Sequence, residues 1–418
     1  MLMEALERFE LRHLRAAAKQ KDDALIAGII TGLVDGRRKL QQLAVKNLPH
    51  HVLCSLSLPT SALLDTKAYE VYEAPKEHKI EAQKPCYEPD SVYSYAEDDM
   101  SICERLYTAG FTDVNQCDGD SMVSLLDLWD CFYSRDPFSL IKSGEWLVSR
   151  GASLYQLSEA GYPSIFSLAD GFGWALSIWY RPPWYRVSEP PTWWQLQHKA
   201  RDLRSRLTKQ HPDVIKFLCL IIREDCRDHC LCACSHDGCS SFQRMLSGYC
   251  RVGAFGDPDP YMTALAAMLD GLQNSAPESF SELQRRKISL QALRFFSFEA
   301  LELTHTCHQT KGFLLSCGRE AKPMDDDEIQ EIREEEAGLI SLLDEMMDEF
   351  SRKYDELGFG LHDFLEECWI PRMNKVRYSY EESEEDPEEN AGEPDPEYQQ
   401  RLREVGVILE SRKLRVSV

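Results

Sequence analysis

The sequence predicts a mainly α-helical fold for most of its 418 residues. Apolar residues recur at helical spacing from Leu2 to about Leu48 and again from Ile329 to Leu357. Between them, the segment from Ser101 to Leu176 alternates helical and turn-like stretches, and one such stretch recurs 41 residues later, at Arg150 after Ala109. These observations favour packed helices, part of them arranged as repeats.

The N-terminal region, residues 1–98, is expected to contain two or three helices followed by a connector. Asp22 or Asp23 is suited to cap a helix, because a carboxylate there accepts from the free N–H groups of the first turn. Gly36 is expected to lie in a turn that opens a further helix, and Pro49 should end that helix. The later part of this region is rich in proline and lacks a sustained period.

A repeat is visible within residues 99–253. Ala109 to Gln116 and Arg150 to Gln156 share a glycine turn after a helical pattern, and a second helix is expected after each turn. Gly238 to Phe242 is a third candidate start of a helix. Stacked helix pairs are therefore expected in this region, with a Trp/Pro-rich and a Cys-rich insertion.

These stretches resemble ankyrin repeats, in which a Gly-Ala-Asp-like turn ends one helix pair and a Gly-x-Thr-Pro-Leu-like start opens the next. Here the turn is Gly151-Ala152-Ser153, and the next start, Gly161-Tyr162-Pro163-Ser164-Ile165, follows ten residues after Gly151. The spacing exceeds the usual 33 residues, and the Thr-Pro-Leu-His signature is reduced. The order of several segments also looks like that of ankyrin-like proteins of filamentous fungi. The resemblance covers about a third of the chain and implies a helical solenoid.

Residues 254–378 are expected to form a C-terminal helical region. The apolar periods predict four helices there: Tyr261 to Leu272, Phe280 to Thr306, Asp325 to Leu357 and Leu361 to about Arg377. The third has an acidic first turn, which suits the helix dipole, and an apolar stripe that we expect to pack on the repeats. Residues 379–418 are acidic and contain several prolines, which predicts a disordered tail with a short terminal helix.

Composition excludes several classes of function. The formal net charge of -23 argues against a nucleic-acid partner, because phosphate binding depends on Lys and Arg. Charged residues interrupt the first fifteen positions, and the longest apolar stretch is far shorter than the roughly 20 residues of a membrane span. We therefore expect a soluble intracellular protein, in the cytoplasm or the nucleus. Short catalytic motifs for nucleotide, zinc-protease or serine-hydrolase chemistry are not found in the sequence, so an enzyme is not predicted.

The segment from Asp225 to Cys239 is unusually rich in metal-ligating side chains. It contains two histidines, His229 and His236, and five cysteines: Cys226, Cys230, Cys232, Cys234 and Cys239. In an extended chain the thiols of the Cys-x-Cys-x-Cys run point to one face, which is half of a tetrahedral zinc site. His305, Cys307 and His308 are candidate ligands from a distance. Buried packing thiols or a redox-labile cluster are the alternatives, because ordinary zinc modules carry a second ligand pair.

Five of the eight tryptophans lie between Phe172 and Trp194, among four prolines. Such a segment is typical of a recognition surface or of a loop folded over a core. Its candidate partner-binding residues are Trp179, Trp184, Trp193 and Trp194. The function expected first is a non-catalytic protein-protein interaction scaffold. The alternatives are a zinc-binding structural or regulatory protein and a transcriptional regulator with ankyrin-like repeats.

Overall fold

The computed structural model describes most of the helical parts of the chain. These are residues 22–55, 92–95, 99–115, 137–157, 163–180, 201–202, 205–206, 209–210, 212–223, 226–228, 230–235, 237–250, 259–307 and 324–384, with Leu14 and Ala17. Within these ranges the fold is mainly helical and contains isolated β-bridges but no β-strand, which confirms the predicted class. The chain divides into two compact units, Met1–Leu365 and Glu366–Val418.

The first long helix is α2, Asp23–Asn47, and α3, His50–Ser55, follows it. Asp22 caps α2 as expected, because its Oδ1 accepts from the N–H of Leu25 at 3.0 Å. The turn predicted at Gly36 is wrong, since α2 runs through this residue without a break. A glycine inside a helix costs only about 1 kcal/mol, which the buried face of α2 offsets.

The two repeated turns have the same local structure. Helix α5, Met100–Ala109, ends at Gly110 with φ 115°, and α7, Pro137–Ser149, is followed by Gly151 with φ 101°. Both glycines adopt the left-handed backbone that other residues rarely tolerate. A short 3-10 helix, η1 at Val92–Tyr95, precedes α5.

Asn115 joins the two turns to each other. Its Nδ2 donates to the Gly151 carbonyl at 2.8 Å, and its Oδ1 accepts from the N–H of Ser153 at 2.7 Å. The two sequence stretches therefore lie side by side in equivalent positions. The second helix expected after the first turn lies outside the described residues.

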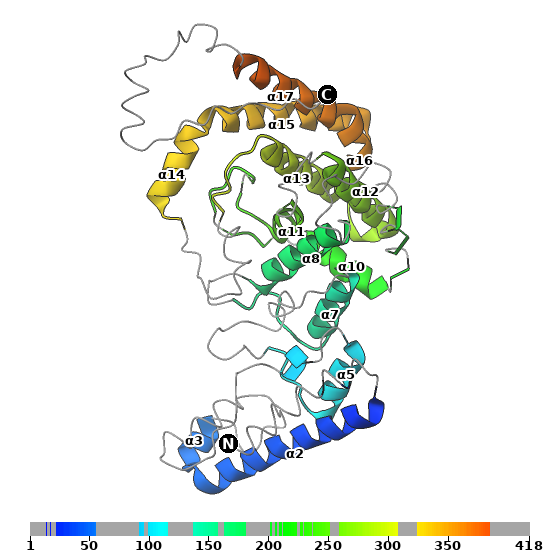
Figure 1. Ribbon diagram of the computed structural model, residues 1–418, viewed down its shortest axis with the longest axis vertical. Coiled ribbons are helices and arrows are strands. Elements are labelled where there is room, and N and C mark those ends of the chain that lie inside the picture. Colours follow the sequence, from blue (N-terminus) through cyan, green and yellow to red (C-terminus); the bar gives the residue numbers. More distant parts are fainter. Residues whose placement is uncertain are drawn as a thin grey trace, which may run out of the picture. The chain divides into compact units, whose positions relative to one another are not determined.

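The next helices are α8, Ser164–Tyr180, α10, Pro212–Arg223, and α11, Ser241–Cys250. Helix α7 packs against α8 and α10, and α11 packs against the same two helices (Figure 1). Gly173 of α8 and Gly248 of α11 lie where these two helices cross, and each faces the backbone of the opposite helix. Their missing side chains let the two helices touch.

The C-terminal helices of the first unit begin with α12, Asp259–Ser275, a 3-10 turn η3, Pro277–Ser279, and α13, Glu282–Ala300. We expected the last of these to continue to Thr306, but it ends at Ala300. Glu302 has φ 55°, so the backbone turns out of the helix there. Residues 301–307 are consequently free to run along the body as a non-helical segment.

The predicted helix from Asp325 to Leu357 is divided in two. Helix α14, Asp326–Glu335, is capped by Asp325 and has the acidic first turn, while α15, Ala337–Leu357, ends at Gly358 with φ 61°. The break at Glu336 places its carboxylate against the N–H of Thr304, at 2.9 and 3.1 Å. Figure 1 shows α15 beside α13, on which its buried residues pack. A short helix α16, Leu361–Phe364, follows.

The second unit is described only as far as Glu384. It contains most of a π-helical turn, Leu365–Trp369, and α17, Ile370–Glu384. The helix continues past residue 379, where we expected disorder to begin, because its glutamates up to Glu384 are compatible with a helix. The three prolines and the rest of the predicted tail lie beyond the described residues.

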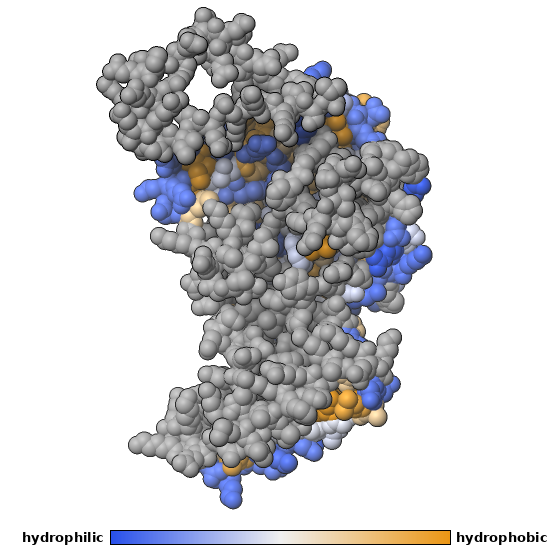
Figure 2. All heavy atoms as spheres, viewed as in Figure 1, coloured by the Kyte–Doolittle hydropathy of each residue, from blue (hydrophilic) through white to orange (hydrophobic). Residues whose placement is uncertain are grey.

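Hydrophilic residues make up most of the coloured surface on the face shown in Figure 2, and hydrophobic residues form smaller patches. Among the described helices, none combines the length and the apolar character needed to cross a membrane. The largest buried side chains include Phe242, Phe296 and Phe350, which come from α11, α13 and α15. The core of the first unit therefore lies between these helices and their neighbours.

Candidate metal centre

The cysteine-rich segment forms a loop that is closed at its base. Arg227 and Ser240 form an antiparallel bridge, and the Asp228 N–H donates to the Cys239 carbonyl at 3.0 Å. Gly238 has φ 86°, and a Cβ atom there would lie 2.0 Å from the Asp228 carbonyl oxygen. Only glycine fits this position, so the loop depends on it.

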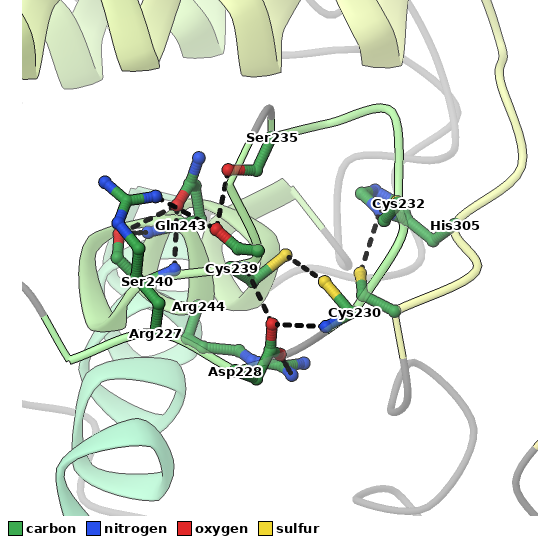
Figure 3. A network of polar contacts seen from close by, with 12 residues as sticks. Arg227, Asp228, Cys230, Cys232, Ser235, Cys239, Ser240, Gln243, Arg244 and His305 are labelled. Atoms are coloured by element: carbon green, nitrogen blue, oxygen red, sulfur yellow. Dashed lines mark hydrogen bonds and ion pairs between the residues drawn. The ribbon is translucent and has the colours of Figure 1, made fainter.

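The thiols of four cysteines in this loop converge on its inner side: Cys230, Cys232, Cys234 and Cys239. Figure 3 labels Cys230, Cys232 and Cys239 among their neighbours. The Cys239 Sγ lies 3.4 Å from the Cys230 Sγ and 3.4 Å from the Cys234 Sγ. A turn at Ala233 and Cys234 completes the run, while Leu231 between the thiols is 64% exposed. The predicted alternation holds for the exposed Leu231 and the buried Cys232, but the turn at Ala233 and Cys234 ends the extended run.

The segment that follows α13 supplies two more ligands from 73 residues away. His305 Nδ1 lies 3.6 Å from the Cys232 Sγ, and the Cys307 Sγ lies 3.4 Å from the same ring nitrogen and 4.0 Å from the Cys234 Sγ. This segment is positioned by the early end of α13 and by the Glu336 carboxylate that holds Thr304. Two regions distant in sequence therefore meet at one cluster.

Cys232, Cys234, His305 and Cys307 have the geometry of a four-coordinate zinc site. Their ligand atoms all lie within 4.8 Å of one another. In a tetrahedron with zinc-ligand distances of about 2.3 Å for sulfur and 2.0 Å for nitrogen, ligand atoms are about 3.8 Å apart for two sulfurs and about 3.6 Å apart for sulfur and nitrogen. Three of the six separations in the cluster, at 3.4 to 4.0 Å, are close to these values, and the other three are at most 4.8 Å.

The imidazole of His305 is oriented toward the thiols. Its Nε2 donates to Glu299 Oε1 at 2.7 Å, so Nδ1 is the nitrogen that faces the thiols. The ring also packs on Phe298, with 4.5 Å between ring centroids. A carboxylate behind a ligating histidine fixes its tautomer and raises its basicity, as is usual around metal ions.

The cluster is buried and favours negative charge on some of its sulfurs. Burial alone would lower the pKa of His305, but its hydrogen bonds with Cys232 and Glu299 raise the pKa to about 10. Hydrogen bonds from neighbouring thiols lower the pKa of Cys232 and of Cys239, against the effect of burial. Hydrogen bonds with neighbouring thiols raise the pKa of Cys230, Cys234 and Cys307, so a zinc ion would have to displace protons from these thiols and from His305.

Three arginines tie the loop to the surrounding helices. Arg244 of α11 forms an ion pair of 2.5 Å with Asp228, and both side chains are largely buried. Arg294 of α13 donates to the Ala233 carbonyl at 2.9 Å, and Arg333 of α14 donates to the Leu231 carbonyl at 3.0 Å. The loop backbone is thus held by α11, α13 and α14.

Asp228 organises the loop, and its carboxylate forms with the sulfurs of Cys230 and Cys239 a second group of potential ligand atoms within 4.8 Å of one another. Its Oδ1 accepts from the N–H groups of Cys239 and Cys230, at 2.7 and 3.2 Å. We expect Asp228→Ala to weaken zinc binding about 10- to 100-fold, because groups behind the ligands fix their position. Competition with a chromophoric chelator measures this change. Asp237→Ala, an exposed aspartate of the same loop, is the matched control and should keep the affinity of the unchanged chain.

The structure brings together some of the predicted site residues and not others. Cys230, Cys232, Cys234 and Cys239 are in the cluster, whereas Cys226 belongs to neither group of side chains close enough to share an ion. The path of the chain explains this, because Cys226 lies before the bridge that closes the loop at Arg227. His229, His236 and His308 lie outside the described residues.

Sequence reasoning proposed His305 and Cys307 only as distant contributors. Their spacing, His-x-Cys directly after a long helix, is a signal that could have completed the ligand set. Of the predicted partner-binding residues, Trp184, Trp193 and Trp194 lie outside the described residues. Trp179 belongs to α8, but its side chain is also outside what the structure describes.

A second concave region of about 1030 Å³ lies between α12, α13 and the end of α15. Its charged groups are engaged with one another: Arg286 pairs with Asp355 at 2.6 Å, and Asp270 accepts from the N–H groups of Leu361 and His362. Burial raises the pKa of Asp270, although these two N–H groups act in the opposite direction. Asp270 therefore stabilises the first turn of α16, and the region does not suggest a reaction.

Comparison with known proteins gives no family for the chain. No family model matches it, and neither the curated proteins nor the solved structures contain a significant match. The resemblance to ankyrin repeats therefore stays a prediction, and the function has to be argued from the site itself.

Proposed function

We propose that the chain is a zinc protein in which Cys232, Cys234, His305 and Cys307 bind a structural ion. The observation that supports this most strongly is the meeting of four ligand atoms within 4.8 Å, from two segments that are 73 residues apart. Three sulfurs and one imidazole nitrogen are a preferred ligand set for zinc. Soft thiolates disfavour magnesium and calcium, which bind through oxygen.

The role of the ion is structural, because the site offers no open position. Structural zinc sites have four protein ligands, whereas catalytic sites keep one position for water or substrate. Cys232, Cys234 and Cys307 are 1%, 0% and 6% exposed, so a substrate has no direct access to the sulfurs. The same burial argues against a catalytic cysteine-histidine pair, which needs an accessible thiolate.

What the ion stabilises follows from the elements that carry its ligands. It joins the loop before α11 to the segment after α13, and the break between α14 and α15 packs on that segment through Glu336. Closing a loop of 73 residues removes about 4 kcal/mol of conformational entropy from the unfolded chain. The ion would thus hold the ends of α11, α13 and α14 that lie next to these segments close together.

Zinc content tests this proposal. The full chain, purified without chelator, should carry at least one equivalent of zinc by mass spectrometry, because structural sites bind too tightly to be emptied by purification. Cys307→Ser should lose it, and Cys54→Ser, an exposed cysteine of α3, should not. Less than about a tenth of an equivalent in the unchanged chain contradicts the proposal.

A protein-binding scaffold is the second candidate function. It is favoured by the packing of the α7 and α8 pair against α10 and α11, since stacked helix pairs in a solenoid present extended binding surfaces. An ankyrin-like solenoid in residues 99–253 is part of this second proposal. A partner captured by the full chain and lost in the Trp193→Ala, Trp194→Ala variant supports it. A partner retained by that variant counts against the tryptophan surface.

A further inference from the structure

The cluster contains more ligands than one zinc ion needs. Besides the four groups assigned above, Cys230 and Cys239 lie with their sulfurs 3.4 Å apart, and Cys239 is buried. The second of these thiols is also 3.4 Å from the Cys234 Sγ. The contact between Cys234 and Cys239 therefore joins the two groups of potential ligands into one series of five sulfurs and one imidazole nitrogen.

Two sulfurs lie at the centre of this arrangement. The Cys234 Sγ is 4.0 Å from the Cys307 Sγ on one side and 3.4 Å from the Cys239 Sγ on the other. The Cys307 Sγ lies 3.4 Å from the His305 Nδ1 and belongs, with Cys232, Cys234 and His305, to the group whose ligand atoms lie within 4.8 Å of one another. His305 and Cys232 lie together at one end of the cluster, at 3.6 Å.

Counting bonds shows what such a cluster can hold. Two tetrahedral ions need eight metal-ligand bonds. A thiolate sulfur has several electron pairs and can bind two ions, so six groups provide eight bonds if two of them bridge. The Cys234 Sγ lies between the two ends, because it contacts the Cys239 Sγ and also belongs to the group formed with Cys232 and His305. The Cys307 Sγ is its neighbour at 4.0 Å, so these two sulfurs are the best placed to bridge.

We infer that the cluster binds two zinc ions that share the thiolates of Cys234 and Cys307. Cys232 and His305 complete the coordination of the first ion, and Cys230 and Cys239 complete that of the second. This inference rests on the proposed zinc site and extends it from one ion to two. All five thiols lose their protons to solvent when the two ions bind.

Charge compensation supports the second ion. Five thiolates and two Zn²⁺ ions leave a net charge of about -1, which lies beside the buried guanidinium of Arg244. The Arg244 side chain is 5% exposed and forms an ion pair with Asp228. With a single ion, Cys230 and Cys239 stay protonated as thiols, and only a second ion uses them as ligands.

Each proposed ion also has its own supporting carboxylate. Glu299 holds the ring of His305, which belongs to the first ion. Asp228 accepts from the N–H groups of Cys230 and Cys239 through one oxygen, and so holds together the two thiols that belong only to the second ion. Carboxylates behind the ligands are the usual support of zinc sites.

The number of zinc ions per chain, measured by native mass spectrometry on the full chain, tests the inference. The unchanged protein should carry two ions, the Cys230→Ser, Cys239→Ser variant one, and the Cys54→Ser control two. A single ion in the unchanged protein overturns the second site but leaves the proposed function intact, whereas no ion overturns both. Two ions in the double variant overturn the assignment of Cys230 and Cys239.

A measurement on the unchanged chain covers the case in which the double variant does not fold. Cobalt is added stepwise to the zinc-free protein, and the absorption of thiolate-bound cobalt is followed. An increase that continues to two equivalents supports two ions. An increase that stops at one equivalent contradicts them.

Discussion

Replacing Cys234 and Cys307 together by serine should lower the melting temperature of the chain by roughly 8 °C or more. The physical reason is the loss of the zinc link across 73 residues, worth about 4 kcal/mol, in a unit for which 1 kcal/mol corresponds to roughly 2 °C. Differential scanning calorimetry of the zinc-loaded proteins measures the change. The variant should also lose hydrogen-exchange protection in residues 226–240 and 301–307.

A chelator separates this effect from simple damage to the core. If the cysteines act through zinc, a strong chelator should lower the melting temperature of the unchanged chain by a similar amount and should not affect the double variant. The two changes are then not additive, as expected for groups that act as a unit. Equal further destabilisation of the variant by the chelator contradicts the zinc link.

Gly173→Ala should destabilise the first unit by about 3 to 5 kcal/mol. A Cβ atom at this position would lie 1.9 Å from the Met245 carbonyl oxygen, and one at Gly248 would lie 2.2 Å from the Asp170 carbonyl oxygen. Backbone atoms cannot move aside as a flexible side chain can, so α8 and α11 would have to separate. Urea unfolding, followed by circular dichroism, measures the loss.

The matched control is Gly338→Ala in α15, where a Cβ atom meets nothing within 4 Å. Alanine is the better helix former there, so this variant should gain about 0.5 to 1 kcal/mol. The change in the free energy of unfolding should therefore have opposite signs in the two variants. This difference tests the close approach of α8 and α11 specifically. A loss of less than about 1 kcal/mol in Gly173→Ala contradicts the crossing of α8 and α11 described above.

The helices were predictable where local chemistry decides them. Asp22 and Asp325 were expected near helix starts and cap α2 and α14, and Gly358 ends α15. The sequence predicts a turn at Gly36, but a single glycine is compatible both with a turn and with the inside of a helix. Only the packing of α2 decides between these two structures. The end of α13 at Ala300 was missed, because nothing local marks the positive φ of Glu302.

The cysteines of the loop could be predicted from the sequence, but the ligands from the segment after α13 could not. The Cys-x-Cys-x-Cys run indicated zinc by its composition and its alternation, and four of the five cysteines between Asp225 and Cys239 lie in the cluster. The other half depends on a contact across 73 residues, which no local pattern specifies. Cys226 was included because it is close in sequence, but the bridge between Arg227 and Ser240 closes the loop after it.

The measurement that tests the zinc centre most directly is X-ray absorption at the zinc K-edge on the full, freshly purified chain. The structure predicts a first shell dominated by sulfur at about 2.3 Å, with a nitrogen contribution at about 2.0 Å from one imidazole. Zinc surrounded only by oxygen and nitrogen would be bound elsewhere on the chain. That result would contradict the assignment of Cys232, Cys234, His305 and Cys307 as ligands.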